Sequence, residues 1–465
     1  MSEQLDVIVV GGGVAGLSCA LRLQQAGLAV RLFEAADRPG GNVATQRIDD
    51  FLVELGPHTL MASGDWVFQL AEELGLGEAL TATRPQAGDR FIARDGAIHT
   101  MPSGLWSFLT SPLLSLGSKL TLATEPFRIK RGEPTDSAED FFVRRFGAEA
   151  ARVLAGAFIS GVYAGDPAKL SAPAAFPLFW GFEQAAGSMI LGSVPYYRRR
   201  SAERAAAGIT PRQGLFSFSE GLGAFPTAAA EALGSAYQGG TSVERIERSG
   251  QHWTVHAGGA SLQARAVVLA VPPPAAASVL AGADQELSGE LGDIPMAPVA
   301  VVHLGFRERQ AAIPEGFGFL VPRGEGIRSL GVLFPSRLFD GRAPAGGDLL
   351  AGFVGGMKDP GALDLDDDAL AAIVLDDLAD LTGLDAEPDM VRVMRYSQAI
   401  PQLVLGHPDR MERVTQRLED NPGLFLAGNY LLGVGLKDAV RSGLETAVSC
   451  RAWLAPSTDA AQDAS

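Results

Sequence analysis

Three features of the sequence predict a mixed fold of the α/β and α+β classes, with a Rossmann-type dinucleotide-binding domain, a β-rich domain and a mostly helical domain. Residues 5–41 are typical of a strand, a glycine-rich turn, a helix and a second strand. Residues 90–212 have mainly helical patterns, whereas residues 291–409 contain several short apolar runs that are typical of strands. The length of 465 residues is sufficient for about two to four domains.

The first element is a buried parallel strand, which the apolar run Leu5–Val10 predicts. A helix follows and ends at Gly27, and a second strand over residues 29–33 ends at Glu34, 23 positions after Gly11. In a dinucleotide-binding unit the glycines allow a tight turn, the helix N-terminus faces the pyrophosphate, and the acid binds a ribose. The residues expected at this site are Gly11, Gly13, Val14, Ala15, Gly16, Glu34 and Ala35. The alternative is an ordinary glycine-rich turn of an α/β protein.

Two further segments indicate that the dinucleotide is FAD rather than NAD. A basic residue and paired glycines, Arg38 and Gly40-Gly41, follow closely and suit a chain that runs beside the pyrophosphate. Near the other end, a strand at residues 423–427 and a helix at 436–453 suit a segment that brings backbone amides and a helix N-terminus to the flavin ring. The remaining residues expected at the cofactor are Gly56, Pro57, His58, Val243, Gly428, Asn429, Val434, Gly435 and Leu436. We interpret His58 as a structural turn residue rather than a base.

Because both ends of the chain contribute to the cofactor site, the FAD-binding domain is expected to be discontinuous. Its expected segments are residues 1–85, 213–290 and 410–465. Residues 90–212 are the expected helical domain, in which Asp136 is the expected N-cap of a helix and Glu139 occupies the capping-box position. The expected β-rich, substrate-binding domain comprises residues 291–409, with strands at 299–304, 317–321, 330–334 and 349–354 and a helix at 364–381.

Charge and cysteine content exclude several classes of function. The net charge of −16 argues against nucleic-acid binding. Residues 90–212, with 15 Lys and Arg against 10 Asp and Glu, are nevertheless cationic, which indicates an anionic ligand, an anionic membrane surface or an ordinary solvated helical face. Two cysteines and six histidines offer neither a disulfide framework nor metal-ligand spacing, so we expect no metal and a reducing cytoplasm. We also expect no signal peptide and no membrane-spanning helix.

Several motifs occur in an order that resembles one family. These are Arg90-Phe91, residues 160–166 (SGVYAGD), residues 188–192 (SMILG), residues 316–322 (GFGFLVP), residues 399–402 (AIPQ) and residues 428–438. On these motifs nearly the whole chain resembles the protoporphyrinogen oxidases, which are members of the amine-oxidase-like flavoprotein group. Tyr396, Leu403 and Ala439 lie at or near positions where that family often has tryptophan, tyrosine and cysteine, which leaves the substrate more open than the reaction type.

The resemblance implies FAD-dependent oxidation of protoporphyrinogen IX to protoporphyrin IX in haem biosynthesis, with oxygen as acceptor and hydrogen peroxide as product. We expect hydride transfer to flavin N5 and no catalytic side chain. A porphyrinogen is apolar with carboxylate arms, so Arg90 is the expected carboxylate anchor, and its alternative is an ion pair with Asp89 or Asp95. The other residues expected to bind substrate are Gly161, Phe317, Leu320 and Phe353. A helix-packing role for the glycine and core roles for the other three are the alternatives.

Other functions and locations stay open at this point. The same chemistry on coproporphyrinogen III, giving coproporphyrin III, is the nearest alternative, followed by a flavin amine oxidase and a non-catalytic flavin-binding protein. The apolar segment Met101–Phe127, followed by Arg128, Lys130 and Arg131, suits peripheral contact with the inner face of the cell membrane. A helix packed into its own domain or a homodimer is the alternative.

Overall fold

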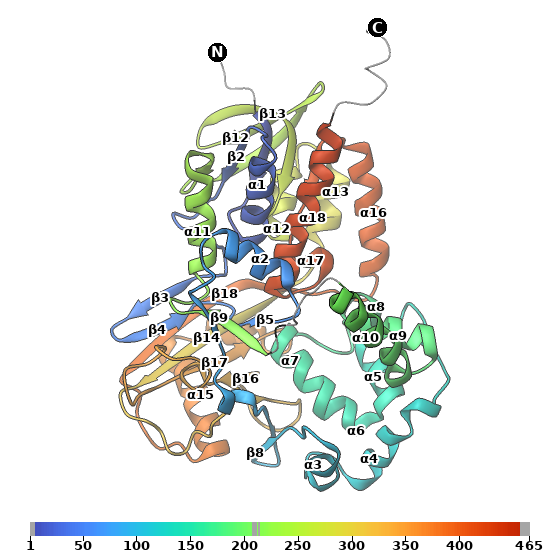
Figure 1. The fold of residues 1–465 in the computed structure, drawn as a ribbon, viewed down its shortest axis with the longest axis vertical. Coiled ribbons are helices and arrows are strands. Elements are labelled where there is room, and N and C mark those ends of the chain that lie inside the picture. The colour runs from blue at the N-terminus through green and yellow to red at the C-terminus, as the bar shows by residue number, and fades with distance from the viewer. Residues whose placement is uncertain (1–4, 207–211, 213, 456–465) are drawn as a thin grey trace.

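The computed structural model describes residues 5–206, 212 and 214–455. Residues 1–4, 207–211, 213 and 456–465, which the predicted domains include, lie outside the described part. Figure 1 shows a nucleotide-binding part at the top, a second sheet at the lower left and a helical lobe at the lower right. The predicted mixed fold with a Rossmann-type domain is confirmed.

The first sheet is assembled from three remote parts of the chain. Its strand order is β10-β2-β1-β13-β12-β11, and β19 pairs with β13. The strands are β1 (Leu5–Val10), β2 (Val30–Phe33), β10 (Tyr237–Gln238), β11 (Val243–Ser249), β12 (His252–Ala257), β13 (Ala260–Leu269) and β19 (Leu424–Leu426). β1 lies between β2 and β13 and pairs with both in parallel, so its side chains are enclosed on both faces of the sheet. This position explains its uninterrupted apolar run.

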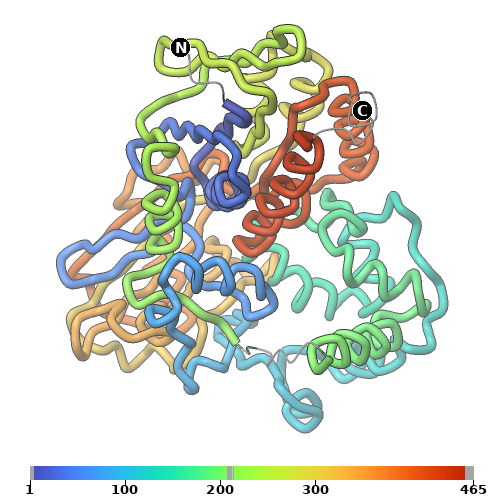
Figure 2. The backbone as a smooth tube through the Cα atoms, turned by 45° about the horizontal axis from the view of Figure 1, so that its top comes forward, coloured from blue at the N-terminus to red at the C-terminus, as the bar shows by residue number. Residues whose placement is uncertain are grey.

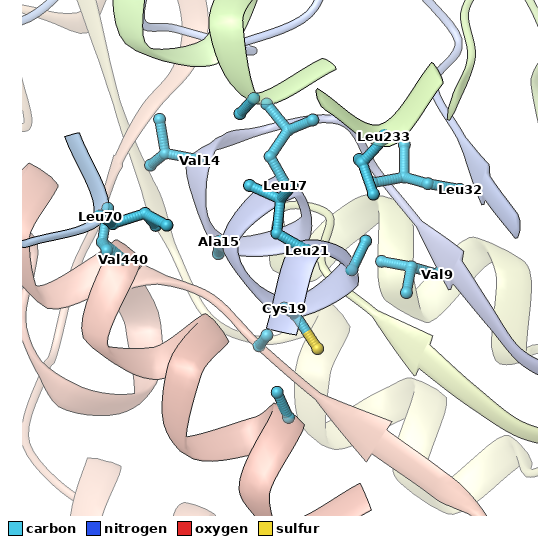
Figure 3. Packing of buried hydrophobic residues seen from close by; sticks show 14 of the residues in the cluster. Val9, Val14, Ala15, Leu17, Cys19, Leu21, Leu32, Leu70, Leu233 and Val440 are labelled. Carbon is cyan, nitrogen blue, oxygen red and sulfur yellow. The ribbon is translucent and has the colours of Figure 1, made fainter. Parts of the chain in front are cut away.

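Helices cover both faces of this sheet. On one face, α1 (Val14–Gln25) packs against α18 (Leu436–Leu454) and α11 (Ala224–Leu233), and α2 (Asp65–Glu73) joins the same core beside α18. Figure 2 shows α1 (blue) beside α18 (red), and Figure 3 shows Leu17, Leu21 and Val440 in their shared core. The other face is covered by α12 (Pro273–Leu280), α13 (Gln285–Gly292) and α16 (His407–Asp420). Full burial of each such leucine or valine contributes about 1.5–3 kcal/mol.

The second sheet has the order β18-β14-β17-β16-β15-β7-β8. Its strands are β7 (Phe91–Arg94), β8 (Ala97–Thr100), β14 (Met296–Phe306), β15 (Gly318–Leu320), β16 (Gly331–Leu333), β17 (Asp348–Gly355) and β18 (Met390–Pro401). One face packs on α15 (Asp367–Thr382) through a core that includes Val374 and Leu378. The four predicted strands correspond to β14–β17, but β18 was not predicted. β7 and β8 also belong here, so the helical part begins after residue 100 rather than at residue 90.

The helical lobe follows β8, an edge strand of the second sheet. Its helices are α3 (Leu105–Thr110), α4 (Leu116–Ala123), α5 (Ala138–Phe146), α6 (Ala148–Ala150), α7 (Ala157–Tyr163), α8 (Ala172–Ala175), α9 (Pro177–Ala186) and α10 (Met189–Ala206), with a π-helical turn at Ala151–Gly156. Within the described part of the chain, no helix is both long enough and apolar enough to cross a membrane. The same residues contain no group of three or more His, Cys, Asp or Glu side chains arranged to hold a metal ion.

The predicted N-cap of α5 is wrong by one residue. Ser137 is the N-cap: its Oγ accepts from the amide of Asp140 at 3.1 Å, and the Asp140 carboxylate accepts from the amide of Ser137 at 3.3 Å. Asp136 instead forms an ion pair with Arg144 at 2.6 Å. Serine and aspartate are similarly good caps, and this tertiary partner decides between them.

Two small sheets complete the fold. One is the two-stranded hairpin of β3 (Thr45–Ile48) and β4 (Phe51–Glu54). In the other, β9 (Leu215–Phe218) pairs with β5 (Leu60–Met61) and β6 (Leu80–Ala82). The short helices are α14 (Pro335–Leu338) and α17 (Asn429–Leu432).

Candidate functional site

The glycine turn between β1 and α1 is packed on one side and open on the other. A Cβ on Gly11 would lie 2.6 Å from the carbonyl oxygen of Ala270, and a Cβ on Gly16 would lie 2.0 Å from that of Gly11. A Cβ on Gly13, by contrast, would meet no atom within 4 Å. Because Gly13 is the N-cap of α1 and supplies no side chain, the first amides of α1 are free to meet a phosphate.

The segment 38–41 lies beside this turn, as the sequence predicts. The amide of Gly40 donates to the carbonyl of Gly12 at 2.7 Å, and Gly13 forms a parallel bridge with Gly40. The exposed Arg38 guanidinium donates to the carbonyl of Gly41 at 2.9 Å. The structure therefore brings the two predicted phosphate-side segments together.

Glu34 ends β2 and faces the same turn. Its carboxylate accepts from the amide of Gly12 at 2.6 Å and from the amide of Ala36 at 2.8 Å. The neighbouring Ala35 is exposed. Glu34 thus holds the turn in place, and its contact with a ribose stays a prediction, as do the cofactor contacts of Ala35 and of Val243 at the start of β11.

The C-terminal segment meets the N-terminal one at close range. A Cβ on Gly443 of α18 would lie 2.1 Å from the carbonyl oxygen of Ala15, so α1 and α18 touch through their backbones. Gly435 is the N-cap of α18 and has no capping side chain, which leaves amides at this helix start for a ligand as well. The amide of Gly428 donates to the Ser442 hydroxyl at 3.0 Å, which fixes the strand end that precedes Asn429.

The loop before α18 reaches the helical lobe. Val434 packs against the apolar cluster that contains Ile159 and Tyr163 of α7, and Leu436 packs on the core of the first sheet. Both predicted residues therefore lie where the nucleotide-binding part and the helical lobe meet.

His58, from the segment Gly56-Pro57-His58, lies against the second sheet. Its ring centre is 5.8 Å from that of His303 on β14 and 5.7 Å from that of Phe353 on β17. Burial, followed by the nearby His303, lowers the pKa of His58 to about 3, and burial lowers that of His303 to about 4. Both rings are neutral weak bases near pH 7, so the structure gives His58 no means to act as a strong base.

One face of the second sheet carries an apolar row. Leu320, Gly331, Phe353, Val301 and Met394 lie opposite one another on β15, β16, β17, β14 and β18, so their side chains share one face. Gly331 has no side chain and separates Leu320 from Phe353. The half-buried Leu330 and Tyr396 pack against the cluster that includes Phe353.

Gly161 of α7 lies directly over this row. A Cβ there would be 2.3 Å from Cδ2 of Leu320, so the glycine packs on Leu320 as in the helix-packing alternative. The structure brings Gly161, Leu320 and Phe353 together. It places Phe317 apart from them, against Ala87, Leu338 and Phe339.

Arg90 lies at one end of the apolar row. It immediately precedes β7, and Ile92 of β7 is opposite Leu320, so strand alternation puts Arg90 on the same face as Leu320. The exposed guanidinium lies 5.6 Å from the ring centre of Phe317. In the described part of the chain no carboxylate is within ion-pair distance of Arg90, and Asp95 pairs with Arg94 instead at 3.4 Å. Arg90 is therefore available to an anion.

Sequence reasoning missed two groups at this face. Tyr396 donates from its hydroxyl to the carbonyl of Leu55 at 2.9 Å, which ties β18 to the chain before His58. The buried Arg342 lies 3.5 Å from the Glu54 carboxylate, whose pKa burial raises. Met394 and Tyr396 alternate with the polar Arg395, and this period of two is a signal that could have revealed β18. No pattern in the sequence around Glu54 predicts its pairing with Arg342, which is remote in the chain.

A family model described as flavin containing amine oxidoreductase matches residues 14–450. The chain belongs to that family. The chloroplastic protoporphyrinogen oxidase of Nicotiana tabacum is 33% identical over 97% of this chain and 86% of its own. The coproporphyrinogen III oxidase of Bacillus subtilis (strain 168) is 30% identical over 94% of this chain and 96% of its own.

A solved structure agrees with these relatives. A protein of Exiguobacterium sp. 255-15, which carries the provisional name of protoporphyrinogen oxidase, is 27% identical with a TM-score of 0.81. The match covers 97% of this chain and 99% of that one. The resemblance inferred from the motifs is thereby confirmed.

This family member is a flavin-dependent oxidase, and its cofactor is FAD. The residues present fit that group: open space at Gly13, two helix starts without capping side chains, and a neighbouring carboxylate at Glu34. When bound, FAD supplies two-electron oxidation at flavin N5. The amides at the start of α1 would hold its phosphates, and the start of α18 would meet its ring.

Proposed function

We propose that the protein oxidises protoporphyrinogen IX to protoporphyrin IX, with molecular oxygen as acceptor and hydrogen peroxide as product. The observation that carries the proposal is the apolar row of the second sheet with Arg90 at its end. A flat apolar macrocycle with carboxylate arms needs apolar walls and a cation at its rim. The names of the curated relatives support the same substrate class.

In this proposal the protein binds and orients the substrate, and no side chain acts as the base. Leu320 and Phe353 hold the macrocycle, and Arg90 binds a carboxylate through a bidentate, charge-assisted pair. His58 and His303 stay neutral because burial opposes their protonation, and His58 packs against Phe353. A proton from a pyrrole nitrogen leaves to solvent, and each two-electron step reduces one oxygen molecule to hydrogen peroxide.

Coproporphyrinogen III is the second candidate substrate, which the Bacillus subtilis relative favours. An amine substrate is disfavoured, because the cationic Arg90 repels an ammonium group at the same place. The test is to supply protoporphyrinogen and coproporphyrinogen separately, under air, to the purified yellow protein. We expect porphyrin fluorescence to rise together with oxygen consumption and peroxide formation. Bound flavin without oxygen consumption on either substrate would contradict the proposal and favour a non-catalytic flavin-binding protein.

We also propose peripheral contact with the inner face of the cell membrane through α3, α4 and the chain after them. Leu105, Trp106, Leu116, Phe127 and Ile129 are each at least 77% exposed. α3 has no fully buried residue; its half-buried Phe108 packs against the apolar cluster of Leu113 and Leu114, which leaves Leu105 and Trp106 exposed for an interface. α3 and α4 lie at the lower end of the helical lobe (Figure 1), and Arg128, Lys130 and Arg131 follow them closely in the sequence. Exposed apolar side chains beside cations suit an anionic interface.

Vesicle flotation tests this contact. The protein is expected to float with vesicles that contain phosphatidylglycerol and to a lesser extent with neutral phosphatidylcholine vesicles. The double variant Trp106→Ser/Phe127→Ser should remain at the bottom of the gradient, whereas Met61→Ser, which alters an exposed apolar residue elsewhere, should float normally. A dimer that the double variant dissociates, with no flotation of the wild type, would assign the surface to self-association.

A further inference from the structure

A second, cationic cavity lies beside the apolar row. Its volume is about 360 Å³, and it is formed where α7 meets the chain after β15 and the end of β17. Its cationic lining residues are Arg323, Arg328 and Lys358. Leu330 and Ala164 belong both to this lining and to the apolar cluster of Phe353, so the cavity adjoins the proposed substrate wall.

The three cations of this cavity outnumber the carboxylates that pair with them. Arg323 contacts Asp166 at 3.0 Å, and Lys358 is 3.9 Å from the same carboxylate, a distance too long for a direct hydrogen bond. Arg328 contacts Asp359 at 2.7 Å. Within ion-pair distance, three cations therefore share two carboxylates in the described part of the chain. Burial also lowers the pKa of Arg323, which means that its guanidinium is incompletely compensated for lost hydration.

A buried hydroxyl in the cavity lining supports a ligand there. Ser329 is 2% exposed, and its Oγ has no hydrogen-bond partner among the described residues. The nearby Asp377 does not satisfy it, because the Asp377 carboxylate accepts from the backbone amides of Arg328 and Ser329 at 3.4 and 2.7 Å. A buried hydroxyl without a partner costs stability, and a carboxylate supplies the acceptor that it lacks.

The cavity and Arg90 lie at opposite ends of β15. Arg90 contacts Phe317, just before the strand, whereas Val321 and Arg323, just after it, line the cavity. Leu320 lies between them. At about 3.3 Å per residue, Phe317 and Arg323 are at most about 20 Å apart. A macrocycle seated on Leu320 and Phe353 would therefore have one rim near Arg90 and the other near the cavity.

We propose that this cavity is a second anion subsite, which takes a carboxylate arm on the rim of the tetrapyrrole opposite Arg90. The inference rests on the proposed function and adds a substrate class to it. Protoporphyrinogen IX has its two carboxylate arms on one rim and uncharged vinyl groups on the other. Coproporphyrinogen III has carboxylate arms all round. The chain accepts both, and the tetracarboxylate gains a contact with Arg328, Lys358 and the Ser329 hydroxyl.

Equilibrium binding tests the subsite independently of turnover. The FAD-loaded protein is titrated with coproporphyrin III, a tetracarboxylate, and with deuteroporphyrin IX, a dicarboxylate, and flavin and porphyrin fluorescence are recorded. The variant Arg328→Gln/Lys358→Gln should raise the Kd for coproporphyrin III about tenfold and leave that for deuteroporphyrin IX within about twofold. Arg413→Gln is the matched control, because Arg413 is a similarly exposed arginine that contacts Glu290 at 2.6 Å on the remote α16.

Three outcomes would overturn the subsite. An unchanged Kd for coproporphyrin III in the double variant would show that no carboxylate enters the cavity. An equal loss of affinity for both ligands would show that the cations do not act on the rim opposite Arg90. A loss of coproporphyrin III affinity in Arg413→Gln would assign the effect to long-range charge. The proposed function fails separately, if the wild type oxidises neither porphyrinogen.

Discussion

Arg90 combines exposure, stacking and the absence of an ion-pair partner among the described residues. Replacement by alanine should raise the KM for the porphyrinogen about ten- to a hundredfold, because a charge-assisted hydrogen bond is worth about 1.5–3 kcal/mol. Arg90→Lys keeps the charge but loses the bidentate geometry, so its KM should lie between that of the wild type and that of Arg90→Ala. Steady-state kinetics with the flavin spectrum as a control measures this. A variant that loses its flavin would make Arg90 structural.

His58 shows how burial produces a pH dependence at a single residue. The unfolded chain binds a proton at this imidazole near pH 6.5, whereas the native state does so only near pH 3. The unfolded state therefore binds more protons between these values, and stability falls as the pH drops below about 6.5. At pH 5 this loss amounts to about 2 kcal/mol from His58.

The variant His58→Gln checks that value. Urea unfolding of the FAD-loaded protein at pH 7 and pH 5 should show a stability loss about 2 kcal/mol smaller in the variant than in the wild type. His303 and His407, whose pKa values burial also lowers, to about 4, leave part of the slope in place. His252→Gln, on the remote β12, is the control for the loss of a histidine side chain. An identical slope in His58→Gln would mean that its imidazole is already protonated, or solvated, in the native state.

At the scale of elements, the contact between α1 and α18 joins the two ends of the chain. Gly443→Ala places a methyl group 2.1 Å from the carbonyl of Ala15, so the helices must separate. We expect a loss of about 1–3 kcal/mol in unfolding free energy, as for other overpacked sites, together with weaker retention of FAD. The flavin-to-protein ratio after gel filtration and the urea midpoint measure both effects.

The control for this change is Gly181→Ala in α9, where an added methyl group meets no atom within 4 Å. That variant should be as stable as the wild type or up to about 1 kcal/mol more stable, because alanine has the better helix propensity. Full flavin content and unchanged stability in Gly443→Ala would contradict the close approach of the two helices.

The sequence was most informative where local pattern and tertiary role agree. β1, α1 and the glycine turn could be predicted because one short segment contains the apolar run, the turn and the helix. β18 could not, because most of its side chains are exposed or half-buried and its pattern is weakly apolar. β7 and β8 form a short hairpin whose membership in the second sheet depends on pairing with β15, more than two hundred residues away.

The same distinction applies to the site. Residues predicted from the glycine motifs meet at one turn, and Leu320 with Phe353 share a row because strand registry brings them together. Phe317 lies elsewhere, because it precedes β15 and packs against Leu338 of α14 and Phe339. The surroundings of His58 depend on β14 and β17, so no local pattern could reveal its depressed pKa.

At the scale of the whole molecule, the predicted FAD site lies where three remote chain segments form one sheet, so removal of FAD should weaken the entire nucleotide-binding part. A ligand that binds only the native state stabilises it by about 2.7 kcal/mol at a free concentration of 100 times Kd. We therefore expect the Tm of the FAD-free protein to rise steadily with added FAD. NAD, which shares the adenine and pyrophosphate but offers no isoalloxazine to the start of α18, should raise the Tm far less. Equal shifts with both dinucleotides would mean that the C-terminal segment contributes nothing to flavin recognition.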